Sequence, residues 1–295
     1  MAIDHLRPEV GAVRDTTIEQ AGVAVAAHAV VHIYRTEGHD VAALSGVTLT
    51  VSPGEVAALL GPSGSGKSTL LQLCAGLLRP AAGRLTVGGD DLARLSPTEL
   101  DEFRRVTLGM VLQGADTNVV PYLNCADNVR LARPGLSATQ VSDALALVGL
   151  PGYDDREVTP LSPGDLQLLA LAGAVAHRPR LLLADEPTSK LDHASRDIVM
   201  EAIFRINAEL GTTVLLVTHD PVVAARMPRT VTIRDGRIGA EGRSGEEFAV
   251  ISADGSLPLP PDVLADLPPG TLLRVLPEPD GLRLVRAEDD DAATD

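Results

Sequence analysis

Apolar residues gather in short runs that alternate with longer segments of mixed polarity. The runs Val56–Leu60, Leu181–Ala184 and Thr213–Val217 are rich in Leu, Val and Ala, which is typical of strands buried on both faces. Between the last two runs, residues 194–209 carry an amphipathic helical pattern. Strands that alternate with helices predict a parallel sheet covered by helices, from about residue 56 to residue 238.

Further elements are predicted around this pattern. Val23–Tyr34 and Val47–Val51 are β-type segments, separated by a turn that contains Gly38. A largely helical insertion is expected between about 96 and 176. Together these segments predict one large α/β domain over residues 22–242.

The composition changes toward the C-terminus. Residues 246–286 combine short β-type runs, a Pro-rich stretch with a short helix near Pro261–Leu267, and turns at Asp254–Gly255 and Asp280–Gly281. We expect a small β-rich module there, followed by a solvated acidic tail at 287–295.

Composition and charge restrict the classes of function. A hydrophobic content of 45% is enough for a large core, but aromatic residues are only 2% of the chain, so no stacking platform for single-stranded nucleic acid is expected. The formal net charge of −15 opposes general binding to phosphate backbones or to anionic lipids. We therefore expect no nucleic-acid partner, and any contact with a nucleotide must be local.

The N-terminal segment and the cysteines indicate a cellular compartment. Residues 1–21 mix charged and apolar positions without the apolar region of a signal peptide, which predicts a flexible leader. No apolar run approaches the ~20 residues that span a bilayer, so we expect a protein that is soluble by itself. Cys74 and Cys125 have no metal-type spacing, which favours a reducing compartment without a disulfide.

Residues 61–69 read Gly-Pro-Ser-Gly-Ser-Gly-Lys-Ser-Thr and fit G-x-x-x-x-G-K-[ST], the pattern of a phosphate-binding loop. Glycines let successive backbone N–H groups turn inward around phosphate oxygens. The strand-like run Val56–Leu60 precedes the loop, and Thr69–Cys74 opens a helix whose N-terminal dipole favours anions. A Gly/Ser linker would lack this order of strand, loop and helix. Lys67 takes the phosphate-contacting position.

A second chemical signal is the pair Asp185–Glu186, which directly follows the apolar run that begins at Leu181. Two adjacent carboxylates in isolation are more often part of a solvated turn. At the end of a buried strand, and downstream of a phosphate loop, they favour catalysis. Asp185 is then placed at the metal, and Glu186 beside the terminal phosphate, where it polarises the attacking water.

With these two motifs, the chain resembles the nucleotide-binding subunit of ABC transporters over about residues 23–240. Other motifs of that family follow in its order. Tyr34 occupies the position of an aromatic residue that stacks on adenine, and Gln113 that of a glutamine between the metal and the membrane partner. Leu161–Gln167 matches the signature motif.

Two more motifs complete the resemblance. Ser189–Asp192 matches the D-loop, and His219 matches the switch histidine that contacts the γ-phosphate. The resemblance implies an α/β fold of the P-loop NTPase class and ABC type. That fold has a parallel-sheet core, an antiparallel β subdomain and a helical subdomain at about 96–176. The small β-rich C-terminal module is additional.

The resemblance also implies the ligands and the residues that bind them. It implies ATP hydrolysis with Mg²⁺. The implied catalytic residues are Lys67, Glu186 and His219, and the implied metal ligands are Ser68, Gln113 and Asp185. The implied nucleotide contacts are Tyr34, Gly61, Pro62, Ser63, Gly64, Ser65, Gly66, Lys67, Ser68, Thr69, Gln113, Ser162, Gly164 and Asp192.

One branch of the family resembles the chain most. Residues 41–46, 91–105 and 108–113 are similar to the macrolide-export, lipoprotein-release and cell-division group. This likeness implies a homodimer or heterodimer of ATP-binding subunits that drives a separate integral-membrane permease by transmitting force. It also implies a peripheral location on the cytoplasmic face of the cell membrane.

The signature departs from the family pattern Ser-Gly-Gly-Glu-Gln, because this chain has Ser162-Pro163-Gly164-Asp165-Leu166. In a head-to-tail dimer this segment opens a helix whose N–H groups meet the γ-phosphate bound to the other subunit. Proline has no N–H to donate. Losing one charge-assisted contact costs about 1.5–3 kcal/mol of dimer closure. We therefore expect slow turnover, or a heterodimer in which the partner supplies a better signature.

Alternatives remain open at this stage. A soluble ABC ATPase acting on ribosomes or DNA generally carries paired nucleotide domains, coiled-coil insertions or basic linkers, and none is visible. A slow ATPase with a regulatory role is another. The module at 246–286 loosely resembles the swapped-hairpin fold of transition-state regulators, but its acidic residues outnumber its arginines, which is the wrong sign for binding DNA. Dimer support or regulation is the better expectation for it.

Overall fold

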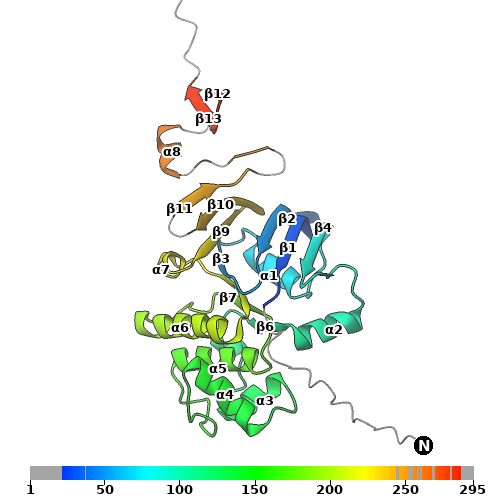
Figure 1. Ribbon diagram of the computed structural model, residues 1–295, viewed down its shortest axis with the longest axis vertical. Helices are drawn as coiled ribbons and strands as arrows, with labels where there is room; N and C mark the ends of the chain where they lie inside the picture. Colours follow the sequence, from blue (N-terminus) through cyan, green and yellow to red (C-terminus); the bar gives the residue numbers. More distant parts are fainter. Residues whose placement is uncertain are drawn as a thin grey trace, which may run out of the picture.

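The computed structural model describes residues 22–36, 38–243, 246–251, 255–257, 259, 261–267, 270–279 and 281–286. The expected leader at 1–21, the acidic tail at 287–295 and the turn residues Asp254 and Asp280 lie outside these described residues. A large sheet runs through the middle of the molecule, with a layer of helices at one end and the C-terminal elements at the other (Figure 1).

Among the described residues, the large sheet has seven strands, and five of them are parallel. In spatial order the strands are β11 (Glu246–Ala249), β10 (Arg237–Arg243), β9 (Arg229–Arg234), β3 (Val56–Leu60), β8 (Thr213–Val217), β7 (Leu181–Asp185) and β6 (Leu108–Val111). β10 and β11 are antiparallel and extend one edge. Val214, Leu215 and Leu216 of β8 are fully buried, as the continuous apolar run predicts.

A second sheet is antiparallel, in the order β2-β1-β4-β5. Its strands are β1 (Val25–Thr36), β2 (His39–Val51), β4 (Ala82–Val87) and β5 (Asp90–Asp91). Helix α1 (Lys67–Cys74) shares one hydrophobic cluster with both sheets. Leu70 and Leu71 of α1 join Val30 and Leu44 of the antiparallel sheet and Leu59 of the large sheet. The second sheet therefore packs against the same helix that follows the glycine-rich loop.

Helices α5 (Pro163–Val175) and α6 (His193–Leu210) lie against the other face of the large sheet. Helices α3 (Cys125–Ala132) and α4 (Ala138–Val148) pack on these two helices. The remaining helical segments of the body are α2 (Pro97–Val106), the 3-10 turn η1 (Ala115–Thr117) and α7 (Pro221–Ala225). Side chains of α3 to α6 form a cluster with Ala58, Val214 and Leu216 of the sheet. The interval 96–176 is largely helical, but it also contains β6, a strand of the large sheet.

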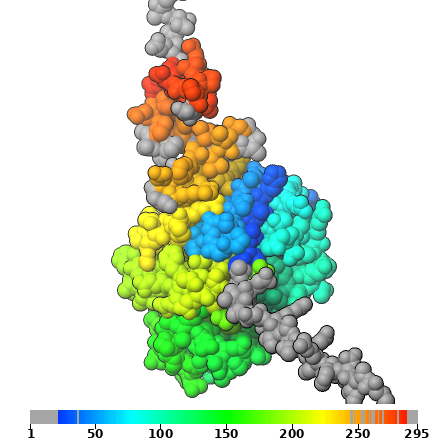
Figure 2. All heavy atoms as spheres, viewed as in Figure 1, coloured from blue at the N-terminus to red at the C-terminus, as the bar shows by residue number. Residues whose placement is uncertain are grey.

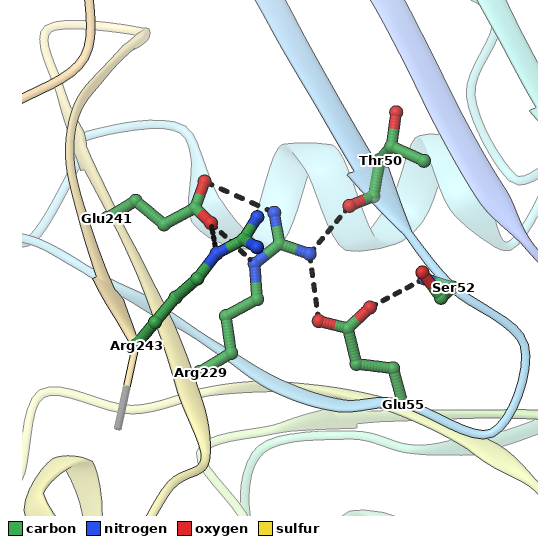
Figure 3. Close-up of polar contacts among 6 residues, drawn as sticks. All are labelled: Thr50, Ser52, Glu55, Arg229, Glu241 and Arg243. Carbon is green, nitrogen blue, oxygen red and sulfur yellow. Dashed lines mark hydrogen bonds and ion pairs between the residues drawn. The ribbon is translucent and has the colours of Figure 1, made fainter. Parts of the chain in front are cut away.

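An ion-pair network ties the antiparallel sheet to the large sheet, and Figure 3 shows its members. The Arg229 side chain, only 9% exposed, donates to the Thr50 carbonyl over 2.7 Å and to the carboxylates of Glu55 and Glu241 over 2.8 and 3.0 Å. Glu55 also accepts the Ser52 N–H over 2.6 Å. Four segments, β2, the turn before β3, β9 and β10, therefore meet at one guanidinium.

The C-terminal residues divide between the large sheet and a separate hairpin. Strand β11 pairs with β10 in a register that places Ala249 opposite Ala240, so the range expected for the module begins with a strand of the large sheet. Helix α8 (Pro261–Asp266) follows, and β12 (Leu273–Glu278) pairs only with β13 (Gly281–Arg286) among the described residues. These last elements, orange to red in Figure 2, form one end of the molecule.

Candidate functional site

The glycine-rich loop joins β3 to α1, in the predicted order. Gly61, Gly64 and Gly66 all have positive φ angles, of 138°, 78° and 101°. A Cβ on Gly61 would lie 2.0 Å from the Ile233 carbonyl oxygen, and a Cβ on Gly66 would lie 2.4 Å from the Ala43 carbonyl oxygen. Glycine is therefore required twice over at these two positions, by backbone conformation and by close approach.

Within the loop, Pro62, Ser63 and Gly64 are exposed, as is Ser68 at the start of α1, whereas Ser65 is buried. Exposure of the tip leaves room for a ligand above the loop. The N-terminus of α1 beside it favours a bound anion.

A turn far away in the sequence supports the loop from behind. The Gly236 N–H, in the β9–β10 turn, donates to the Ser65 carbonyl over 3.2 Å, and the Gly236 carbonyl accepts the Ser45 N–H over 2.8 Å. Sequence reasoning missed this support. The pair Asp235–Gly236 signals a tight hairpin turn, but nothing in the sequence indicates that the turn packs against the loop.

Lys67 points into its own loop. Its Nζ donates to the carbonyls of Gly61 and Pro62 over 2.9 and 2.7 Å, and the residue is only 7% exposed. Burial lowers the pKa of this ammonium, and the carboxylates of Glu186 and Asp185 oppose that shift. A strongly anionic ligand would restore the environment that the ammonium prefers, because it adds opposite charge beside a desolvated cation.

Tyr34 lies next to the helix that follows the loop. Its hydroxyl is 3.3 Å from the Thr69 hydroxyl of α1, and its ring, 40% exposed, meets the edge of His32. An exposed ring beside the phosphate loop is suitably placed for a flat base.

The two acidic residues follow β7 as predicted, and their side chains have different surroundings. Burial raises the pKa of Asp185, while a hydrogen bond with the Ser68 side chain and the charge of Lys67 act in the opposite direction. Glu186 has a φ of 47°, in the left-handed region, and its N–H donates to the Val217 carbonyl over 3.0 Å. Such a backbone conformation costs about 1–3 kcal/mol and is concentrated at functional sites.

Two predicted residues, from two other segments, converge on the Glu186 carboxylate. The Gln113 side-chain amide donates to one oxygen of Glu186 over 2.7 Å, and Nδ1 of His219 lies 2.8 Å from the other oxygen. The His219 side chain is 66% exposed and that of Glu186 17%. The carboxylate is therefore held by the side chains of Gln113 and His219, and that of His219 is mostly exposed to solvent.

The residues present suit a magnesium ion shared with phosphates. Among the described residues there is no cluster of three or more His, Cys, Asp or Glu side chains that could hold a metal alone. The Ser68 side chain is hydrogen-bonded to Asp185. The Gln113 side chain bonds to Glu186, which directly follows Asp185 in the sequence, so the three proposed ligands lie near one another. Mg²⁺ is commonly held by one or two protein oxygens together with substrate phosphates, which matches this set.

The predicted signature and D-loop residues occupy helix starts. Ser162 caps α5 by accepting the Asp165 N–H over 3.1 Å, and Pro163 is the first helical residue. Asp192 caps α6 by accepting the Ser195 N–H over 2.7 Å, a bond that lowers the pKa of Asp192. In the described part of the chain, no hydrogen bond or ion pair joins Ser162 or Asp192 to the phosphate loop.

Gly164 also has a packing role. A Cβ there would come within 2.9 Å of the Ser195 side chain on α6. Glycine is therefore needed for the close approach of α5 to α6, whatever else this residue does.

A phosphate loop between a parallel strand and a helix, with an acidic pair at the end of another strand of the same sheet, defines a nucleotide-hydrolysing enzyme of the P-loop class. Comparison with known proteins specifies the family. The family profile described as ABC transporter matches residues 44–189. Together with the relatives described next, this match shows that the chain belongs to the family and is an ABC ATPase, which binds and hydrolyses ATP, as the sequence predicts.

Individual relatives agree with the branch that the sequence resembles. A lipoprotein-releasing system ATP-binding protein, LolD 1 of Caulobacter vibrioides, is 38% identical over 76% of this chain and 98% of its own length. A macrolide export ATP-binding/permease protein, MacB of Rhodopirellula baltica, is 39% identical over 71% of this chain, which spans only 32% of MacB. The predicted likeness to this branch is confirmed.

A solved structure agrees with the fold. A dimeric ATP-binding cassette in a post-hydrolysis state, bound to ADP and Pi, matches with a TM-score of 0.67 and 31% identity over 74% of this chain and 98% of that one. The predicted ABC-type α/β fold is therefore confirmed. In the part of the chain that the structure describes, no helix is both long and apolar enough to cross a membrane.

Proposed function

We propose that two ATP-binding subunits, each with this architecture, close head to tail around ATP and that hydrolysis reopens them to drive a separate membrane permease. One observation carries the proposal. The acidic pair lies beside the phosphate loop, because Asp185 is hydrogen-bonded to Ser68 and the charge of Glu186 acts on Lys67. Ser162 and Asp192, in contrast, cap helices and make no described contact with that loop. A second subunit supplies the missing contacts in this arrangement.

The similarity to a dimeric cassette bound to ADP and Pi supports this arrangement. In the closed pair, Lys67 exchanges its loop carbonyls for phosphate oxygens, and the amides of the loop cradle the same phosphates. Tyr34 stacks on the base.

Hydrolysis requires a water in line with the bond that breaks. Glu186 takes a proton from this water while the water oxygen attacks the γ-phosphorus, and the bond to the bridging oxygen breaks to give ADP and phosphate. His219, whose Nδ1 contacts the Glu186 carboxylate, is placed to donate a hydrogen bond to the γ-phosphate. Mg²⁺, held by Ser68, Gln113 and Asp185, would neutralise phosphate charge when bound.

The partner is an integral-membrane permease in this proposal, as the names LolD and MacB suggest for the relatives. Leu112, which directly precedes Gln113, is 45% exposed. An exposed apolar side chain beside this glutamine suits contact with a partner segment that moves Gln113. The protein then lies at the cytoplasmic face of the membrane through its permease.

Substitution of the base tests the proposal. Glu186→Gln keeps the size of the side chain but cannot take a proton, so ATP-dependent dimers should accumulate while the hydrolysis rate falls by at least about a hundredfold. Size-exclusion chromatography with ATP and Mg²⁺, and a phosphate-release assay, measure the two effects. Hydrolysis at the parental rate, or a monomer at saturating ATP, would refute the roles assigned to Glu186 and to pairing.

A further inference from the structure

We infer that Arg196 is a positioning residue: it ties the loop that carries His219 to the first turn of α6, and so links the parts of one subunit that serve two different ATP molecules. The inference rests on the proposed pairing of subunits. It concerns an ion pair that the motif-based reading of the sequence did not include.

The contact joins two elements at the site. Nη1 of Arg196 lies 3.3 Å from Oδ2 of Asp220, the residue that directly follows His219. The two side chains are 11% and 29% exposed, so the pair is largely sheltered from water and screening is weak. Since His219 itself is mostly exposed, its position depends on the backbone that Asp220 helps to hold.

Asp220 is fixed on its own side of the contact. Its carboxylate caps α7 by accepting the Val222 N–H over 2.8 Å, and its own N–H donates to the Thr218 hydroxyl over 3.1 Å. Because the Asp220 carboxylate is fixed to its own loop, a displacement of Arg196 also displaces that loop. The ion pair is therefore a link between α6 and the His219 loop rather than a contact between two freely moving side chains.

The first turn of α6 is also where the trans-acting motifs meet. Asp192 caps this helix through Ser195, and the Ser195 side chain fills the space above Gly164 of the signature. In the proposed pair, Gly164 and Asp192 face the nucleotide of the other subunit, whereas His219 faces its own. Arg196 follows Ser195 directly and therefore connects the two groups of residues through one turn of helix.

The surroundings of Arg196 favour positioning over simple helix packing. Its Nε is buried and has no hydrogen-bond partner among the described residues, although Asp197 lies 3.5 Å away. A buried N–H without a partner destabilises a fold. This arrangement is explained if the contact with Asp220 fixes the position of the guanidinium.

A mutant cycle with a matched control tests the inference. Arg196→Gln removes the charge, and Asp220→Asn removes the opposing charge but keeps an N-cap residue for α7. The control is Arg226→Gln, which breaks the 2.9 Å ion pair between Arg226 and Asp197. Arg226 directly follows α7, so this pair also joins α6 to that region, and it does not touch Asp220. Asp197 also lies 3.5 Å from Nε of Arg196, and that contact stays in place in the control.

Steady-state ATP hydrolysis is measured for the full chain, together with its permease if hydrolysis requires one. We expect Arg196→Gln and Asp220→Asn each to lower kcat about tenfold, because a small displacement of a catalytic group is costly, while KM for ATP changes less than about twofold. The double variant should be no slower than the slower single variant, because both remove the same interaction. Arg226→Gln should stay within about twofold of the parent in kcat.

Three outcomes would overturn the inference: parental kcat in Arg196→Gln, additive losses in the double variant, or an equal loss in Arg226→Gln. Failure of the proposed pairing gives a different result. In that case the Glu186→Gln protein forms no ATP-dependent dimer, with or without the Arg196 substitution, and both proposals fall. If only the positioning role is wrong, that dimer still forms and the cycle shows no coupling.

Discussion

At the scale of single residues, Pro163 determines how many amide donors the start of α5 offers. Pro163 has no N–H, and the Asp165 N–H is already taken by the Ser162 hydroxyl. The Gly164 amide and the Ser162 O–H are the donors left in this turn. Proline suits the first helical position, so helix formation is favoured at the expense of a contact for the partner's nucleotide.

Restoring an amide should therefore increase turnover. In Pro163→Gly, the new N–H can add a charge-assisted hydrogen bond to the γ-phosphate in the closed pair. Such a bond is worth about 1.5–3 kcal/mol, so we expect kcat/KM for ATP to rise roughly tenfold or more. A phosphate-release assay over a range of ATP concentrations measures the change.

The matched control for this substitution is Pro97→Gly. Pro97 is also the first residue of its helix, α2, and also follows a serine cap, Ser96. Its substitution should cost similar stability but leave hydrolysis unchanged. An equal rise in both variants, or none in Pro163→Gly, would contradict the role of the signature.

At the scale of elements, the β9–β10 turn is a structural support for the phosphate loop. Gly236 has a φ of 72°, and a Cβ there would lie 2.8 Å from the Ala43 carbonyl oxygen and 3.0 Å from the Leu44 Cα. Gly236→Ala must therefore displace the turn or β2. Because the Gly236 N–H bonds to Ser65, the loop should shift as well, and we expect ATP affinity to fall about tenfold. Isothermal titration with ATP measures it.

Gly149→Ala separates this effect from simple backbone strain. Gly149 caps the C-terminus of α4 with a φ of 99°, but a Cβ there would meet only the Arg205 guanidinium at 3.8 Å. The control should lose about 1 kcal/mol of stability, as a residue with a Cβ does at positive φ, and keep its ATP affinity. Equal affinities in both variants would show that the turn does not support the loop.

These elements also show where prediction from sequence succeeds. The apolar runs of β3, β7 and β8, the loop glycines and the position of Glu186 all follow from local pattern and spacing. The contacts of Gly236 with Ser65 and of Arg196 with Asp220 do not, because they join residues whose separation in the sequence carries no periodic signal. The same reason applies to β11, because nothing in its local sequence specifies which sheet it joins.

At the scale of the whole molecule, Arg229 holds the antiparallel sheet against the large sheet, and both sheets flank α1 (Figure 3). Arg229→Gln leaves Glu55 and Glu241 without their main partner. Removing one member of a buried ion pair costs several kcal/mol, but these carboxylates are 22% and 18% exposed, so we expect a loss of about 2–3 kcal/mol. A lower midpoint of urea unfolding would report it.

The pH dependence of that stability follows from the same network. Burial alone would raise the pKa of both carboxyls, but hydrogen bonds outweigh it. The bonds come to Glu55 from Ser52 and Arg229, and to Glu241 from Arg229 and Arg243, so both pKa values fall below their ordinary value of 4.5. A carboxyl with a lowered folded-state pKa stabilises the fold above 4.5, and this contribution disappears as the pH falls through the folded-state pKa. The urea midpoint of the parent should therefore fall steeply below pH 4.5 and that of Arg229→Gln less so.

Arg243→Gln distinguishes the buried link from surface charge. Arg243 pairs with the same Glu241, but its side chain is 62% exposed, so its ion pair is worth at most about 1 kcal/mol. This variant should unfold near the parental urea concentration and lose less of the acid sensitivity than Arg229→Gln does, because Glu241 keeps Arg229 and Glu55 keeps both of its partners. If Arg243→Gln lost as much stability as Arg229→Gln, the cohesion of the two sheets would depend on the net charge of this surface. A loss confined to Arg229→Gln instead assigns the cohesion to one guanidinium that four segments share.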